Sequence, residues 1–196
     1  MVWAHSKGFF MKTIETDVAI LGAGTAGLSA YKAAVKAGKR VLLIEGGPYG
    51  TTCARVGCMP SKLLIAAAEA AHGASHLDAF GIRLDGHVSV DGQAVMDRVK
   101  RERDRFVGFV LEGVENIPAE HKLRGYARFM SPGVLMVDDH TRVETVSVVI
   151  ATGSTASVPP PFKGLGDRLV VNDDVFDWDD LPKRVVVFGP GVIGLE

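Results

Sequence analysis

Two cysteines five residues apart are the residues of this chain whose types and spacing best suit chemistry. Cys53 and Cys58 are the two cysteines among 196 residues, and Lys62 follows the second by four residues. Thiols at short spacing can open and close as a disulfide, and thiolates near a helix N-terminus and a cation have a lowered pKa. The alternatives are two small buried hydrophobic side chains and a zinc site. For zinc, no Cys or His pair supplies the missing ligands, so we expect no metal.

The spacing of the cysteines restricts the backbone between them. Five residues of an ideal helix rise about 7.5 Å, whereas the Cα atoms of a disulfide lie at most about 7 Å apart. Cys53 and Cys58 can therefore form a bridge where the helix start is distorted, and Gly57 and Pro60 allow that distortion. A bridge under such constraint is easier to reduce, as catalytic disulfides are.

A glycine-rich turn precedes the cysteines. The apolar run Asp17–Leu21 predicts a buried strand, and Leu28–Ala37 predicts a helix. In such a turn the first glycine permits the tight bend, the second lets the backbone approach a pyrophosphate, and the third lets helix and strand pack closely. The residues of this first fingerprint are Gly22, Ala23, Gly24, Thr25, Ala26 and Gly27.

An acidic residue ends the next predicted strand. Arg40–Ile44 is apolar after its first residue and leads to Glu45, which lies eighteen residues beyond Gly27. A carboxylate at this place can accept hydrogen bonds from two ribose hydroxyls. The alternative is a solvated acid at a strand end.

The fingerprint pattern returns near the end of the chain. Arg184–Phe188 predicts another buried strand, and Gly189, Gly191 and Gly194 repeat the spacing of the first three glycines. This internal repeat predicts the start of a second nucleotide-binding domain. Because the sequence given ends at Glu196, we expect the chain to be a fragment of a longer protein.

Other elements are predicted between the two fingerprints. One helix is expected from about Cys53 through Ala71, bent by Pro60, and a second over Gln93–Val114. The charged face of the second helix, at residues 98–105, is interpreted as solvated. Three strands of a small antiparallel meander are expected at Leu123–Met130, Val134–Val137 and Thr145–Ile150.

Composition excludes several classes of protein. A formal net charge of −1 gives no sign of a nucleic-acid partner, and no apolar run approaches the ~20 residues that span a membrane. Residues 1–10 lack an apolar signal core, so we expect no secretory signal. Two cysteines in a non-secreted chain point to redox or catalytic use, and a cytoplasmic location is expected.

These motifs occur in an order that resembles the flavoprotein pyridine nucleotide-disulfide oxidoreductases, and within them the dihydrolipoamide dehydrogenases. The resemblance spans about Thr16 to Glu196. It implies an α/β fold: a Rossmann-like FAD-binding domain, with a parallel sheet, helices and a small antiparallel β-meander, before the truncated start of a second Rossmann-like NAD(P) domain. The implied boundaries are an N-terminal extension at 1–10, the FAD-binding domain with the dithiol at 11–155, a connector at 156–183 and the second domain at 184–196.

The resemblance also implies a role for individual residues. Cys53 would be the thiol that exchanges with substrate, and Cys58 would lie against the flavin and form a thiolate charge-transfer complex. Lys62 would sit near the flavin N5 and pair with Glu196. Ala127 matches a position whose backbone meets the adenine. The other implied cofactor contacts are the first fingerprint, Glu45, Gly46, Thr52, Cys53, Lys62, Thr152, Gly153 and Ser154 for FAD, and Gly189, Gly191 and Gly194 for NAD or NADP.

One position departs from the family pattern. The family usually has Gly-Gly-Thr-Cys, which ends in the first thiol, whereas this chain has a threonine, Thr51, in place of the second glycine.

The activity that the resemblance implies is oxidation of dihydrolipoamide with NAD, in a homodimer that also works with the lipoyl domains of 2-oxoacid dehydrogenase complexes. The alternatives are a mercuric or glutathione-type reductase and a FAD-binding module without turnover. Residues that would separate NAD from NADP lie beyond Glu196.

Overall fold

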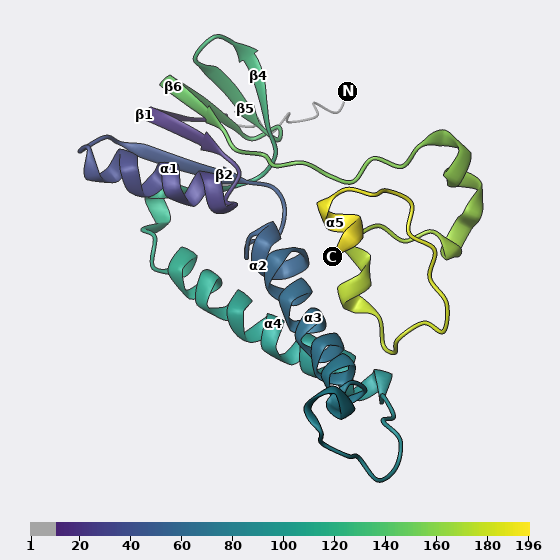
Figure 1. Ribbon diagram of the computed structural model, residues 1–196. Helices are drawn as coiled ribbons and strands as arrows, with labels where there is room; N and C mark the ends of the chain where they lie inside the picture. The colour runs from purple at the N-terminus through teal and green to yellow at the C-terminus, as the bar shows by residue number, and fades with distance from the viewer. Residues whose placement is uncertain (1–10) are drawn as a thin grey trace, which may run out of the picture. The chain divides into compact units, whose positions relative to one another are not determined.

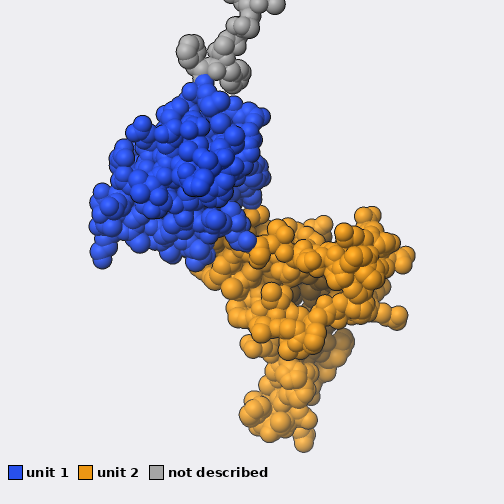
Figure 2. Space-filling model, turned by 90° about the horizontal axis from the view of Figure 1, so that it is seen from above, with its two compact units in different colours: residues 1–49, 112–153 blue, residues 50–111, 154–196 orange. Residues whose placement is uncertain are grey.

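The computed structural model describes residues 11–196, so the predicted extension at 1–10 lies outside the described residues. The described chain forms two compact units (Figure 2). The first consists of the residues up to Tyr49 together with Glu112–Gly153, and the second of Gly50–Leu111 together with Ser154–Glu196. The predicted domains are consecutive ranges of the sequence, whereas each compact unit combines two separate ranges. The predicted domain boundaries therefore stay predictions.

The first unit is built on one six-stranded sheet in the order β3-β2-β1-β6-β5-β4 (Figure 1). The neighbouring strands β3, β2, β1 and β6 are parallel to one another. Beyond β6, the strands β5 and β4 continue the sheet with antiparallel pairing. This confirms the predicted α/β fold with a parallel sheet and an antiparallel meander. The strands are β1 (Lys12–Leu21), β2 (Val41–Glu45), β3 (Lys122–Arg124), β4 (Ala127–Ser131), β5 (Val134–Val137) and β6 (Thr141–Ile150).

Both faces are covered in β2 and in the second half of β1, which explains the continuous apolar runs of these two strands. Successive residues of β1 and β2 point to opposite faces. On one face their side chains pack with Leu135 and Val137 of β5 and Val143 of β6, and on the other with α1 (Thr25–Lys36), whose Tyr31 is buried. The two clusters are Ala19, Leu21, Leu42, Ile44, Leu135, Val137 and Val143 on the first face, and Ile20, Ala23, Tyr31, Val41, Leu43 and Ile117 on the second.

Two strand predictions need correction. The predicted strand Leu123–Met130 is two strands, β3 parallel to β2 and β4 antiparallel to β5. The break falls at Gly125, where φ is +140° and a Cβ would overlap the Asp138 carboxylate. The predicted strands at 17–21 and 145–150 are the second halves of β1 and β6, because these two pair along ten residues each.

The second unit is mainly helical. It contains α2 (Thr52–Val56), α3 (Cys58–Ala74), most of α4 (Gly92–Glu115) and the short α5 (Val192–Leu195). The predicted single helix bent at Pro60 is wrong: α2 and α3 meet at Gly57, whose φ and ψ are −134° and −126°. Pro60 lies in the first turn of α3, where its missing N–H costs no hydrogen bond. The short 3₁₀ segments are Leu77–Phe80, Ala119–His121, Pro160–Arg168 and Asp174–Asp177.

The predicted buried strand at Arg184–Phe188 is also wrong. These residues pair with no strand in the described part of the chain, and Val186 and Phe188 are 75% and 68% exposed. The described residues provide no neighbouring parallel strand with which this run could pair. The long helix, by contrast, is confirmed as α4. Among the described residues, no helix is both long and apolar enough to cross a bilayer.

Candidate functional site

The first fingerprint forms the tight turn that its glycines predict. Gly22 has φ +104°, and a Cβ there would overlap the carbonyl oxygen of Ala151. A Cβ on Gly27 would overlap the carbonyl oxygen of Gly22. The end of β1, the start of α1 and the backbone at Ala151–Thr152 are therefore packed together at contact distance, and glycine is required at both positions.

The start of α1 is open to a ligand. Gly24 is the N-cap residue, no side chain caps the helix, and a Cβ on Gly24 would meet no atom within 4 Å. Thr25 and Ala26 in the first turn are exposed. Unpaired backbone N–H groups at the start of a twelve-residue helix bind an anion well. The turn therefore fits the pyrophosphate of a dinucleotide.

Glu45 connects the fingerprint to the loop after β2. Its Oε2 accepts a hydrogen bond from the Ala23 N–H at 2.7 Å, and its Oε1 accepts one from the Gly47 N–H at 2.7 Å. Each carboxylate oxygen has a second lone pair, so ribose hydroxyls can still donate to Glu45. The side chain is half-buried, and its two backbone partners rule out the simple solvated acid.

Sequence reasoning missed two residues that shape the next loop. The Tyr126 ring lies against Gly46, where a Cβ would be 2.5 Å from Cδ1 of the ring. Arg124 donates to the carbonyl oxygens of Gly47 at 2.6 Å and Gly46 at 3.2 Å, and its guanidinium lies over the Tyr49 ring. Arg124 and Tyr126 lie just before Ala127, a predicted cofactor contact, and this position was the one feature of the sequence that could have indicated them.

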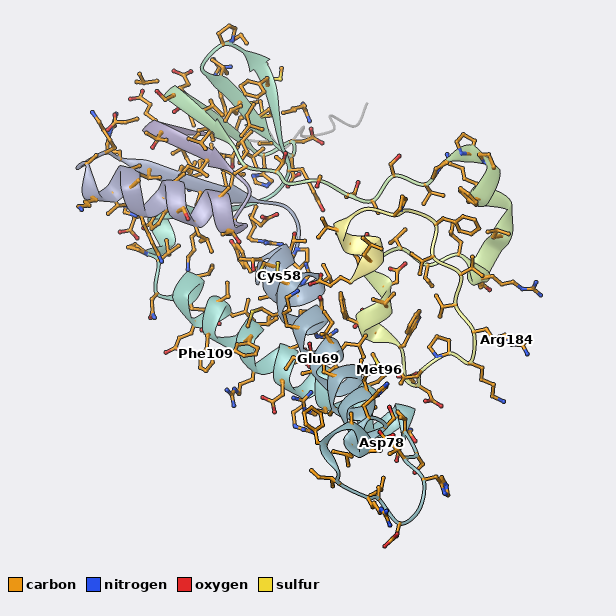
Figure 3. All side chains as sticks on the ribbon, in the orientation of Figure 1. Cys58, Glu69, Asp78, Met96, Phe109 and Arg184 are labelled. Atoms are coloured by element: carbon orange, nitrogen blue, oxygen red, sulfur yellow. The ribbon has the colours of Figure 1, made fainter. Side chains whose placement is uncertain are left out.

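The two cysteines are free thiols on adjoining helices. Cys53 is half-buried in α2. Cys58, which Figure 3 labels, is exposed at the first residue of α3. Burial raises the pKa of the Cys53 thiol, and hydrogen bonding with Cys58 raises it further. The expected lowering of a thiol pKa is therefore wrong for Cys53. Helix α2 has five residues and its N-terminus is already capped by Thr51, so it has little charge to offer the sulfur.

Gly57 lets the two helices meet closely. A Cβ there would lie 3.1 Å from the carbonyl oxygen of Thr52 and 3.2 Å from Cα of Cys53. Such contacts are tighter than packed side chains tolerate without a shift. The predicted distortion between the cysteines is thus present, and it falls at the glycine.

Thr51, the departure from the family pattern, has a backbone conformation that suits glycine. Its φ and ψ are 61° and 147°, a region that non-glycine residues rarely adopt. Its Oγ1 accepts a hydrogen bond from the Ala54 N–H at 3.2 Å and caps α2. The cap partly offsets the backbone strain.

Lys62 and Glu196 form an ion pair, as the resemblance implies. The Lys62 side chain is 65% exposed and that of Glu196 is 28% exposed. Beside Lys62, the Oγ of Ser61 is buried and has no hydrogen-bond partner among the described residues. This hydroxyl is therefore free to bond a water molecule or a bound cofactor.

The second fingerprint repeats the backbone of the first. Gly189 has φ +134°, and a Cβ on Gly194 would overlap its carbonyl oxygen. Gly191, the N-cap of α5, has φ −77° and ψ 176°, close to the −76° and −173° of Gly24. The internal repeat is therefore a repeat of conformation, although its strand is unpaired.

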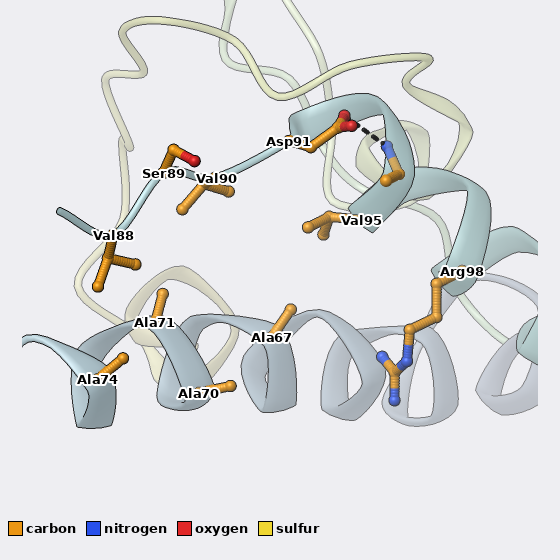
Figure 4. Close-up of a pocket in the computed structure, with 11 residues that line it drawn as sticks. Ala67, Ala70, Ala71, Ala74, Val88, Ser89, Val90, Asp91, Val95 and Arg98 are labelled. Atoms are coloured by element: carbon orange, nitrogen blue, oxygen red, sulfur yellow. Dashed lines mark hydrogen bonds between the residues drawn. The ribbon is translucent and has the colours of Figure 1, made fainter. Parts of the chain in front are cut away.

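The predicted site residues divide between the two units. The first unit contains the first fingerprint, Glu45, Gly46, Ala127, Thr152 and Gly153, and the second contains Thr52, Cys53, Cys58, Lys62, Ser154, Gly189, Gly191, Gly194 and Glu196. A groove of about 420 Å³ on the second unit includes none of them (Figure 4). Alanines of α3 line one side of it, and residues 88–91 and the start of α4 line the other.

Residues 16–196 match the family described as pyridine nucleotide-disulphide oxidoreductase, and the chain belongs to this family. It is 32% identical to a mitochondrial dihydrolipoyl dehydrogenase of Pisum sativum, with 98% of this chain and 39% of that protein aligned. It is 36% identical to a dihydrolipoyl dehydrogenase of Cupriavidus necator, over 93% and 41%. A leghemoglobin reductase of Vigna unguiculata is 33% identical, over 97% and 37%. The chain thus spans about two fifths of these relatives.

Solved structures confirm the fold. The HOCl-induced flavoprotein disulfide reductase RclA from Escherichia coli superposes with a TM-score of 0.73 at 24% identity. The superposition covers 91% of this chain and 38% of that one. At this identity the likeness concerns the fold alone.

Proposed function

We propose that this chain supplies the FAD-binding and dithiol part of an oxidoreductase that oxidises dihydrolipoamide and reduces NAD. The observation that carries the proposal is the arrangement in the second unit: Cys53 and Cys58 are neighbours across the Gly57 break, and Lys62 in the same helix as Cys58 is paired with Glu196. The dihydrolipoyl dehydrogenase relatives support the choice of substrate.

The first unit would hold the nucleotide part of FAD. The open N–H groups at Gly24 and the first turn of α1 would bind the pyrophosphate, and Glu45 would accept from the ribose. Tyr126 and Ala127 would border the adenine. When bound, FAD accepts two electrons from a dithiol and passes them to nicotinamide. Ser61 and Lys62 in the second unit would lie near its ring.

The dithiol would exchange with substrate in two steps. A substrate thiolate attacks Sγ of Cys53 in the oxidised pair, the bond to Cys58 breaks, and Cys58 leaves as a thiolate. The second substrate thiolate then attacks the substrate sulfur bonded to Cys53, forms the substrate disulfide and releases Cys53. The substrate loses two electrons and two protons, and the cysteine pair gains the electrons. The raised pKa of Cys53 favours its thiol form, so it retains one proton, and a base supplied by the longer protein takes the other.

Thiol titration tests the central claim. After mild oxidation, the folded protein should have no titratable thiol, and two should return on treatment with dithiothreitol. The Cys53→Ser variant is the control and should show one thiol in both states. Two freely reactive thiols in the oxidised, folded protein would contradict the proposal.

The finer parts of the proposal need separate assays. Ser61 favours dihydrolipoamide over glutathione, because glutathione reductase-like proteins commonly carry lysine at that place. Comparing lipoamide, glutathione and mercuric ion as substrates distinguishes between the candidate reductases. Bound flavin without turnover of any substrate would indicate a FAD-binding module instead. The homodimer, the lipoyl-domain partner, the cytoplasmic location and the domain boundaries belong to the same proposal.

A further inference from the structure

Helix α4 connects the helix of Cys58 and Lys62 to the segment before the second fingerprint. On one side, the Arg98 Nη1 donates to the carbonyl oxygen of Leu63, the residue after Lys62, at 3.1 Å. On the other side, Lys100 and Arg103 bind the segment at residues 176–181, here named the strap. The sequence-based interpretation of this charged face as solvated is therefore wrong for Lys100 and Arg103, whose side chains are 24% and 15% exposed, whereas Arg98 is exposed.

Arg103 is the most enclosed contact between α4 and the strap. Its Nη1 donates to the Asp177 carboxylate at 2.6 Å and to the carbonyl oxygen of Phe176 at 3.1 Å. Its side chain is 15% exposed, and Phe176 is 6% exposed. A guanidinium that holds both a carboxylate and a backbone carbonyl beside a buried ring fixes the position of the strap more firmly than a solvated ion pair does.

Two further contacts set the direction of the strap. The Lys100 Nζ donates to the Asp179 carboxylate at 2.7 Å. At the start of α4, a Cβ on Gly92 would overlap the Asp180 carboxylate and lie 2.9 Å from the Leu181 N. The strap therefore runs antiparallel to α4 from Arg103 back to Gly92, about 16 Å along the helix axis.

The contacts form a closed ring of residues within the second unit. Lys62 belongs to α3, α3 is bonded to α4 through Arg98, α4 is bonded to the strap, and the chain beyond the strap ends in Glu196, which pairs with Lys62. In the described residues, α5 and the run before it have no strand partner. Attachment of the strap therefore fixes the point, 15 residues before Glu196, from which the chain continues to Lys62.

We propose that Arg103 is a positioning residue that keeps Glu196 beside Lys62 by holding the strap on α4. The importance of this role rests on the proposed function, in which Lys62 lies near the reacting groups. The ion pair itself can be measured without cofactor or substrate. A failure of this inference is thus distinguishable from a failure of the proposed function.

Trace acylation of lysines in the ligand-free chain, quantified by mass spectrometry, tests the inference. The Glu196 carboxylate occupies one side of the Lys62 ammonium group and hinders the approach of the reagent. Glu196→Gln should therefore speed the labelling of Lys62 and set the rate of the unpaired amine. Arg103→Gln should raise the Lys62 rate about twofold to fourfold, as loss of an exposed ion pair allows. The control is Arg101→Gln, which removes the same charge from α4 but breaks a contact to Glu102 alone. It should leave the rate unchanged.

A conservative variant separates positioning from misfolding. Arg103→Lys keeps a cation that can still reach the Asp177 carboxylate, so it should retain slow labelling of Lys62, and Lys32 in the other unit should label at one rate in every variant. A Lys62 rate that does not change in Arg103→Gln while it rises in Glu196→Gln would overturn the proposal. So would an Arg103→Lys variant in which Lys62 labels as fast as in Arg103→Gln, or a Glu196→Gln variant that labels like the unaltered chain.

Discussion

Single residues in this structure make contacts that the sequence does not suggest. Glu45 stands at the place expected for a ribose ligand, and it also accepts from the N–H groups of Ala23 and Gly47. Thr51 caps the helix of Cys53 while its backbone occupies a region suited to glycine. In both cases the hydrogen bonds depend on backbone groups that the folded chain brings near.

Replacing Glu45 by alanine should weaken FAD binding by about 1.5–3 kcal/mol, the range for hydrogen bonds to a charged group. The variant should also unfold more easily, because two backbone N–H groups lose their acceptor. Calorimetric titration with FAD measures the first effect, and urea unfolding the second. Glu15→Ala, a change at an exposed position of β1, is the control. Unchanged flavin affinity would place Glu45 outside the ribose site.

Two variants at Thr51 separate backbone strain from capping. Thr51→Gly removes a strain of about 1–3 kcal/mol and loses a cap worth a few tenths of a kcal/mol when glycine replaces it. Thr51→Ala retains the strain and loses about 1 kcal/mol with the cap. The glycine variant should therefore be the more stable of the two in urea unfolding. Equal stabilities would show that the backbone at this position is relaxed.

The pH dependence of Cys53 alkylation should change when the neighbouring thiol of Cys58 is removed. Burial and Cys58 both raise the pKa of Cys53, so its alkylation should accelerate at a higher pH than that of an ordinary thiol, near 8.5. In Cys58→Ser the thiol neighbour is lost, and the midpoint should move to lower pH. The rate of iodoacetamide alkylation against pH gives both midpoints. An unchanged midpoint in the variant would show that burial alone sets the pKa.

At the scale of elements, local patterns were predictable and long-range partners were not. The first fingerprint, α4 and the parallel sheet with its meander follow from spacing and apolar runs. The helix is broken at Gly57, whereas the sequence predicts a bend at Pro60. A proline suggests a helix breaker in the sequence, but in the first turn of a helix its missing N–H loses no hydrogen bond. The run at 184–188 has the composition of a strand, yet a strand needs a neighbour. The contacts of Arg103 and Lys100 join residues over 70 positions apart, which no periodicity reveals.

The helix junction should control how fast the disulfide closes. Gly57→Ala places a Cβ against Thr52 and Cys53, and α2 must shift to accommodate it. Oxidation of the two thiols should therefore slow, as followed by thiol titration against time. Gly73→Ala in α3 is the matched control, since a Cβ there meets no atom within 4 Å, and it should leave the rate unchanged. Equal oxidation rates in both variants would show that Gly57 does not control closure of the disulfide.

At the scale of the whole molecule, two nucleotide-binding turns occur in a chain that covers about two fifths of its relatives. The first turn is supported by a complete sheet, and the second by a four-residue helix. We expect residues 1–196 alone to bind FAD poorly and to show no NADH-dependent reduction of lipoamide. The positive control is a dihydrolipoyl dehydrogenase of full length in the same assay. Turnover near that of the control would show that these residues suffice.

The strap contains its own optical reporter. Trp178 lies between Asp177 and Asp179, both of which bind α4, and its side chain is half-buried. With Trp3 changed to phenylalanine, Trp178 becomes the single tryptophan of the chain. Its emission should then shift to the red as salt screens the two ion pairs. Detachment of the strap can therefore be watched in real time, and a stopped-flow salt jump would give its lifetime.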